Sequence, residues 1–197
     1  MHLDTGKLYR ATAQLVLAAG GNPADPQSAT SAAWRVDPAS LADPALLTEE
    51  VAQASSVVAA IPEVRAALLE RQRDFAAHPP APPKGHRPRG AVLDGRDIGT
   101  AVCPGATVKL FVTASAEARA ERRLRELRQR GATVIYGDVL QDMKERDARD
   151  SERRVAPLAA APDAVTLDTT GLDADQVFEL ASGIIERALA AHGISPR

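Results

Sequence analysis

Charged side chains directly follow an apolar run in residues 91–100, whose sequence is AVLDGRDIGT. The apolar residues end at Asp94, and Arg96 and Asp97 come next. This pattern predicts a short buried strand that ends in a polar turn. In a parallel α/β sheet, ligands bind just beyond the carboxyl ends of the strands, so these side chains would stand at the mouth of a site. The alternative is a solvated turn of mixed charge.

A second charged stretch, KERDARDSERR, covers residues 144–154. On a helix, Arg146, Asp150 and Arg153 share one face because they fall at positions i, i+4 and i+7. Arg149 lies beside that face. Arginines grouped in this way suit phosphoryl transfer, since negative charge spreads over the oxygens of the transferred group, and Asp150 would hold them or bind a sugar hydroxyl. Mixed charge on a solvated helix face is the alternative.

Ser56, Arg65 and Asp97 form a looser set that suits the recognition of a base. A carboxylate accepts a hydrogen bond from an exocyclic amine, and an arginine donates to a ring nitrogen or a carbonyl. Cytosine presents both features on one edge. The spacing of the three residues leaves open whether they meet.

Composition limits the class of protein. The chain has 197 residues with 45% apolar content and a net charge of −2, which fits one domain or one domain with a small appendage. Aromatic residues make up only 3%, so base stacking and an arginine-rich RNA-binding domain are disfavoured. Cys103 is the single cysteine, which predicts neither a disulfide framework nor a metal-ligand cluster. With no apolar run long enough to span a bilayer and no signal peptide, we expect a cytoplasmic protein without a membrane or nucleic-acid partner.

Hydrophobic periodicity predicts alternating strands and helices, and hence an α/β fold: a three-layer parallel sheet with helices on both faces. Residues 22–45 are predicted to be a loop with one helical turn at most, and residues 78–90 a proline-rich surface loop. Thr48, Ser115 and Asp138 are the expected N-caps of three helices. The expected strands are 91–94, 108–112 and 164–168, with the tail of another at 1–6; the expected helices are 7–19, 49–60, 63–77, 116–130, 139–152 and 173–191.

Together, these stretches resemble bacterial cytidylate kinases, which phosphorylate CMP and dCMP with ATP. Each motif alone is weak, but they occur in the family's order over nearly the whole chain. The matching text is LDTGKLYR at 3–10, EVAQASSVVAAIPEVRAALLERQRDF at 50–75, DGRDIGT at 94–100, VKLFVTASAEARAERR at 108–123, KERDARDSERRVAPL at 144–158 and VTLDTTGLDADQV at 165–177.

The resemblance implies roles for the substrate-binding residues. Thr5 and Arg10 would contact the acceptor phosphate or sugar, with Tyr9 packing nearby. Ser56, Arg65 and Asp97 would recognise cytosine. Asp150, on the charged helix, would hold the nucleotide sugar.

The resemblance also implies a division of the chain. Residues 1–19 and 91–197 would form a core of the P-loop-kinase type, and residues 20–90 a helical insertion that binds the nucleoside monophosphate. Residues 116–152 would include a lid that closes over ATP, which enters with Mg²⁺. The lid residues expected to bind ATP are Arg119 and Arg123, and those expected to stabilise the transferred phosphate are Arg96, Arg146, Arg149 and Arg153.

The sequence departs from the family's pattern at its start. The family begins with a strand and a glycine-rich loop of the type G-x-x-x-x-G-K-[ST], whose backbone N–H groups hold the phosphates of ATP. The only Gly-Lys pair is Gly6-Lys7, and Leu8 follows it. We therefore expect an N-terminally truncated chain that lacks the loop and the central first strand. Residues 91–94 and 108–112 would then flank an empty position and would not pair directly.

Several functions remain open at this point. The first is a monomeric kinase that transfers the γ-phosphate of ATP to CMP or dCMP. The second is a catalytically inactive fragment that binds pyrimidine nucleotides, because the phosphate loop is absent. The third is a kinase for UMP or another small molecule, which Ser56, Arg65 and Asp97 disfavour. The region 20–47 is also shorter than the β-rich insertion that the family often carries there.

Overall fold

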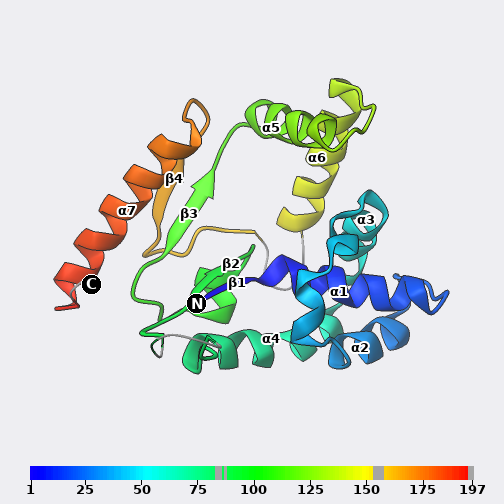
Figure 1. The fold of residues 1–197 in the computed structure, drawn as a ribbon, viewed down its shortest axis with the longest axis horizontal. Helices are drawn as coiled ribbons and strands as arrows, with labels where there is room; N and C mark the ends of the chain where they lie inside the picture. Colours follow the sequence, from blue (N-terminus) through cyan, green and yellow to red (C-terminus); the bar gives the residue numbers. More distant parts are fainter. Residues whose placement is uncertain (83–85, 87, 153–157, 195–197) are drawn as a thin grey trace. The chain divides into compact units, whose positions relative to one another are not determined.

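The computed structural model of the chain describes residues 1–82, 86, 88–152 and 158–194 (Figure 1). Its contacts divide the chain into two compact units. Unit 1 contains Met1–Cys103, and unit 2 contains Pro104–Glu152 together with the chain from Leu158. The predicted separation into a kinase core and a nucleotide-binding insertion is a functional division and stays a prediction.

The described residues of unit 1 form four α-helices around a core of small and branched apolar side chains. Helix α1 packs against α2 and α3, and α2 packs against α4. The side chain of Asp4 caps α1 by accepting from the N–H of Lys7, and Thr48 caps α3 by accepting from the N–H of Val51, as expected for the latter. The helices are α1 (Thr5–Ala18), α2 (Pro26–Trp34), α3 (Glu49–Val58) and α4 (Pro62–Ala77).

The strands of unit 1 are β1 (His2–Asp4) and β2 (Val92–Asp94), which pair in parallel. Leu3 lies opposite Leu93, so the two carboxyl ends stop side by side at Asp4 and Asp94. Helix α1 therefore begins at the same sheet edge from which the DGRD turn departs. A single turn of π-helix, η3 (Ile98–Val102), follows that turn.

The prediction that residues 22–45 form a loop is wrong. This region contains α2 and the 3₁₀ turns η1 (Pro38–Ala42) and η2 (Pro44–Leu47). Each of the three begins with an Asp-Pro pair in which the carboxylate accepts from a backbone N–H two or three residues later, while proline fixes φ for the first helical position. The alanines that α2 buries are small enough to give little hydrophobic signal in the sequence; they are Ala29, Ala32 and Ala33.

Unit 2 contains the strands β3 (Leu110–Thr113) and β4 (Val165–Asp168), which also pair in parallel. Its helices are α5 (Ala116–Gln129), α6 (Tyr136–Ser151) and α7 (Ala174–Ala191), and α5 packs against α6. Ser115 caps α5 as predicted, and α5 ends before Gly131, whose φ is +83°. Asp173 starts α7 with a capping box.

Asp138 does not cap α6, in contrast to the prediction. The helix already begins at Tyr136, and its N-cap is Ile135, which makes no side-chain capping bond. Asp138 lies in the first turn instead, where its negative charge still interacts favourably with the positive end of the helix dipole.

Strands β2 and β3 belong to different two-stranded sheets. Among the described residues they do not pair with each other, which is the outcome that the sequence predicts. The α/β class and the parallel pairing are confirmed, whereas the three-layer arrangement and the missing first strand stay predictions. No helix in the described part of the chain combines the length and the apolar character that crossing a bilayer requires.

We expect Leu68→Ala to destabilise unit 1, because Leu68 in α4 is fully buried and its truncation leaves a cavity. The free energy of unfolding should fall by about 2–5 kcal/mol. Urea unfolding followed by circular dichroism and by the fluorescence of Trp34, the single tryptophan and a residue of unit 1, measures it. Leu180→Ala is the control, since Leu180 is exposed and its loss should change little.

Candidate functional site

A buried ion pair joins α4 to the turn after β2. The Nη2 atom of Arg65 donates to Oδ2 of Asp97, and both side chains are about nine-tenths buried, with exposed fractions of 8% and 11%. Charged groups removed from water need partners of opposite charge, and these two supply each other. The sequence left open whether Arg65 and Asp97 meet, and the structure joins them directly.

The Arg65 guanidinium has two further neighbours in unit 1. Its Nη1 atom donates to the carbonyl oxygen of Ala59 at 3.3 Å, at the end of α3. Its Cζ atom lies 5.9 Å from the centre of the Tyr9 ring, within the range of a cation–π contact. Residues from α1, α3 and α4 thus converge on one cation, with Tyr9 packed beside it.

Ser56 lies in the last turn of α3 and is buried. Its hydroxyl has no hydrogen-bond partner among the described residues, although buried polar groups nearly always have one. An unsatisfied buried hydroxyl costs about 1–3 kcal/mol. A ligand that donates to this oxygen or accepts from it would remove that cost.

Thr5 is buried at the start of α1, and its hydroxyl donates to the carbonyl oxygen of Asp94 at 2.8 Å. A Cβ atom on Gly95 would lie 2.3 Å from this hydroxyl oxygen and 2.9 Å from Cδ1 of Ile98, so only glycine fits there. Thr5 therefore fixes the DGRD turn. Its predicted contact with a substrate phosphate or sugar stays a prediction.

The other predicted residues of unit 1 are Arg10 and Arg96. Nη1 of Arg10 donates to the carbonyl oxygen of Leu46 at 2.7 Å, which ties α1 to η2. Arg96 lies in the turn between β2 and η3, next to Asp97. The roles of both arginines toward a phosphate stay predictions.

In unit 2, both Nη atoms of Arg119 donate to the carboxylate of Asp147. The two hydrogen bonds measure 2.8 and 2.6 Å and connect α5 to α6. They raise the pKa of Arg119, so it stays charged at every physiological pH. Asp147 was not among the predicted site residues, because nothing in the sequence indicates that α5 and α6 pack at this level.

The remaining predicted residues of unit 2 lie on the same two helices. Arg123 forms an ion pair with Glu126 at 3.0 Å, and Nε of Arg149 donates to the carbonyl oxygen of Glu145 at 3.3 Å. Asp150 is buried, with 2% exposed, one turn after Arg146 on α6. Arg153 lies outside the described residues.

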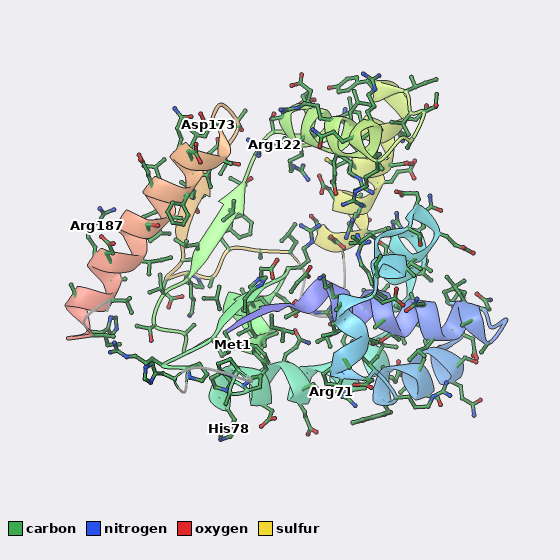
Figure 2. The ribbon with its side chains drawn as sticks, viewed as in Figure 1. Met1, Arg71, His78, Arg122, Asp173 and Arg187 are labelled. Carbon is green, nitrogen blue, oxygen red and sulfur yellow. The ribbon has the colours of Figure 1, made fainter. Side chains whose placement is uncertain are left out.

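Arginines that bind backbone carbonyls were also missed by the sequence analysis. Arg73 of α4 donates to the carbonyl oxygens of Ala101 and Val102. Arg122 of α5, labelled in Figure 2, donates to the carbonyl oxygens of Thr169 and Leu172, the latter at 3.2 Å. Cys103 directly follows η3. Burial raises the pKa of its thiol, and the nearby positive charge of Arg73 partly opposes that rise. Such contacts have no local sequence signal, since their acceptors are main-chain atoms far along the chain.

The chain matches the family model described as cytidylate kinase over residues 1–187. It is 58% identical over 186 residues to the cytidylate kinase of Rhodospirillum rubrum, a match covering 93% of this chain and 84% of that protein. A cytidylate kinase of Paramagnetospirillum magneticum is 58% identical over 184 residues, with the same two coverages. One of Granulibacter bethesdensis is 55% identical over 186 residues, covering 94% of this chain and 84% of that protein.

The chain belongs to the cytidylate kinase family. The resemblance stated from its motifs is thereby confirmed at the level of the family. Membership also makes the chain a relative of phosphotransferases. Among the predicted residues of unit 1, the contacts join Arg65 to Asp97 and to the half-buried Tyr9 in one cluster, and Ser56 is buried in the last turn of α3.

We expect Arg65→Leu to lower the free energy of unfolding by about 3–5 kcal/mol, because it leaves the buried Asp97 carboxylate without its partner. Chemical denaturation of the full chain measures the loss. The double variant Arg65→Leu/Asp97→Leu should recover most of it, since no charge then remains unpaired. A double variant no more stable than Arg65→Leu would contradict this account of the pair.

Proposed function

We propose that this chain is the acceptor-binding part of a nucleoside monophosphate kinase that transfers the γ-phosphate of ATP to CMP or dCMP. The observation that carries the proposal is the buried Arg65–Asp97 pair in a chain of the cytidylate kinase family, and the unsatisfied Ser56 hydroxyl of α3 adds to it. Reaction of a CMP phosphate oxygen with the γ-phosphorus forms the new P–O bond. The bond to the bridging oxygen of ADP breaks, and ADP leaves.

The cluster has the chemistry to discriminate between cytosine and uracil. Arg65 occupies Oδ2 of Asp97, which leaves Oδ1 to accept from an exocyclic amine. Cytosine carries an amine at that position, whereas uracil carries a carbonyl oxygen that a carboxylate repels. The free hydroxyl of Ser56 and the guanidinium of Arg65 would serve the ring nitrogen and carbonyl.

The site that binds ATP would need residues that this sequence does not contain. No G-x-x-x-x-G-K-[ST] pattern occurs in residues 1–197. We propose that a strand and a phosphate loop preceding residue 1 complete the enzyme.

The lid arginines are already engaged within unit 2. Arg119 binds Asp147 and Arg123 binds Glu126, so contact with ATP would require these pairs to open or to share the guanidinium. The described residues offer no group of three or more acidic, histidine or cysteine side chains that could hold a metal ion. Mg²⁺ would accordingly enter with the nucleotide, as part of the substrate.

Two other interpretations are outcomes of the same assay. One is a catalytically inactive fragment that binds pyrimidine nucleotides, and the other is a kinase for UMP or another small molecule. We further propose a monomer that works in the cytoplasm, as the composition suggests.

We expect ADP production from ATP and CMP only by a version of the chain extended with the residues encoded immediately upstream. Each missing donor to the transferred phosphate lowers the rate by about 10²–10³, and the phosphate loop supplies several donors. A coupled assay with CMP, and separately with UMP, compares the two versions. Activity in neither version would favour the inactive fragment, and CMP-dependent turnover by the shorter chain would contradict the role given to the loop.

We expect Asp97→Asn in the extended chain to lower the ratio of kcat/KM for CMP to that for UMP by about 10- to 100-fold, because the amide can donate to the uracil carbonyl. Steady-state kinetics with both acceptors measure this ratio. Asp94→Asn is the control, since Asp94 lies three residues earlier at the end of β2, is largely exposed and pairs with His2. An unchanged ratio in Asp97→Asn would remove Asp97 from base recognition.

A further inference from the structure

Helix α4 carries a second arginine that reaches the segment bearing Asp97. Nη2 of Arg73 donates to the carbonyl oxygen of Ala101 at 2.9 Å, and Nε donates to that of Val102 at 3.2 Å. Both acceptors lie at the end of η3, the π-helical turn for which Asp97 is the N-cap. The same helix therefore holds η3 at both of its ends, through Arg65 at the first and Arg73 at the last.

The turn η3 is short and depends on outside contacts. The N–H groups of Ala101 and Val102 both donate to the carbonyl oxygen of Asp97, at 2.9 and 3.2 Å, and Cys103 donates to that of Ile98 at 2.7 Å. A single turn fixes several backbone dihedrals for few hydrogen bonds and is unfavourable alone. The last carbonyl groups of any helix lack partners within it, and Arg73 supplies two N–H donors to them.

The conformation of η3 sets the direction of the Asp97 carboxylate. The carbonyl of Asp97 is the acceptor that closes the turn, so a change in η3 alters the backbone dihedral angles at Asp97 and with them the direction of the Cα–Cβ bond. π-helical turns are rare and occur frequently at functional sites. The orientation of the Asp97 carboxylate is tightly restricted, because its Oδ2 atom accepts from Arg65 while Oδ1 would have to face the base.

We propose that Arg73 is a positioning residue for base discrimination: by holding the end of η3, it aims the Asp97 carboxylate at the exocyclic amine of cytosine. This inference rests on the proposed function of the Arg65–Asp97 pair. Arg73 itself does not contact the base. A guanidinium suits this role better than an ammonium, because its rigid fork reaches two carbonyl groups at once.

The chain supplies a matched control two residues earlier. Arg71, also on α4, donates to the carbonyl oxygens of Trp34 and Val36, the former at 2.8 Å (Figure 2). It makes the same type of contact as Arg73, but with the end of α2 instead of the end of η3. Any general effect of removing an arginine from α4 should therefore appear in both variants, and only an effect through η3 should be specific to Arg73.

The first experiment measures binding of CMP and of UMP to the full chain by titration calorimetry, for the parent, Arg73→Ala, Arg73→Lys and Arg71→Ala. We expect Arg73→Ala to reduce the preference for CMP over UMP by about tenfold, which corresponds to about 1.4 kcal/mol. Arg73→Lys should recover only part of the preference, and Arg71→Ala should keep it. A loss of folded protein lowers the binding-competent fraction for both nucleotides and leaves their affinity ratio unchanged.

The second experiment needs no nucleotide and separates this inference from the proposed function. Hydrogen exchange at the amides of residues 101–103 reports the closure of η3, since these amides donate within the turn. Faster exchange there in Arg73→Ala but not in Arg71→Ala would support the role of Arg73 in holding the turn. Equal exchange in the parent and Arg73→Ala would overturn the inference, even if the parent binds CMP.

The two results also distinguish the possible failures. If the parent shows no preference for CMP, the proposed function fails, and hydrogen exchange alone decides whether Arg73 holds η3. If the parent prefers CMP and Arg73→Ala keeps that preference, Arg73 has no role in discrimination and the inference is wrong.

Discussion

The ion pair between Arg65 and Asp97 connects the helical part of unit 1 to its small sheet. Arg65 belongs to α4, and Asp97 follows β2, whose parallel neighbour β1 leads directly into α1. A buried charge pair contributes little net stability compared with apolar packing, yet either charge left alone is very unfavourable. Its presence therefore restricts how α4 and the DGRD turn can meet, and Tyr9 and Ala59 complete the surroundings of the same guanidinium.

Arginine has a structural role in both units that its phosphate-binding chemistry alone would not suggest. Arg10 and Arg71 bind carbonyl groups at the ends of neighbouring elements, and Arg122 does the same in unit 2. Arg119 instead binds a carboxylate across two helices. A guanidinium can do both because it is a planar fork with several donors and is weakly hydrated. Part of the positive charge that looks available for nucleotides in the sequence thus holds secondary structure elements together.

Local patterns allowed much of the fold to be predicted. Strand 91–94 and the helices capped by Thr48 and Ser115 follow from short-range signals, and the structure contains them. Helix α2 was missed because its buried face is alanine, which gives weak periodicity, and because Asp-Pro pairs indicate turns and helix starts equally. In the candidate site, residue types grouped Arg65 with Asp97, but their spacing could not show that the two meet. The contacts of Arg73 depend on main-chain atoms that no residue type reveals.

The Asp-Pro starts of the region 25–47 make this part of unit 1 sensitive to acid. Hydrogen bonds from Ser28 lower the pKa of Asp25, and those from Ala45 and Gln14 lower that of Asp43. A carboxylate whose pKa is lower in the folded than in the unfolded chain contributes its stability above the ordinary value of 3.8 and loses it as the pH falls through the folded value. Acidification should thus weaken the N-caps of α2 and η2 together. Near neutral pH both carboxylates are ionised and both caps are intact.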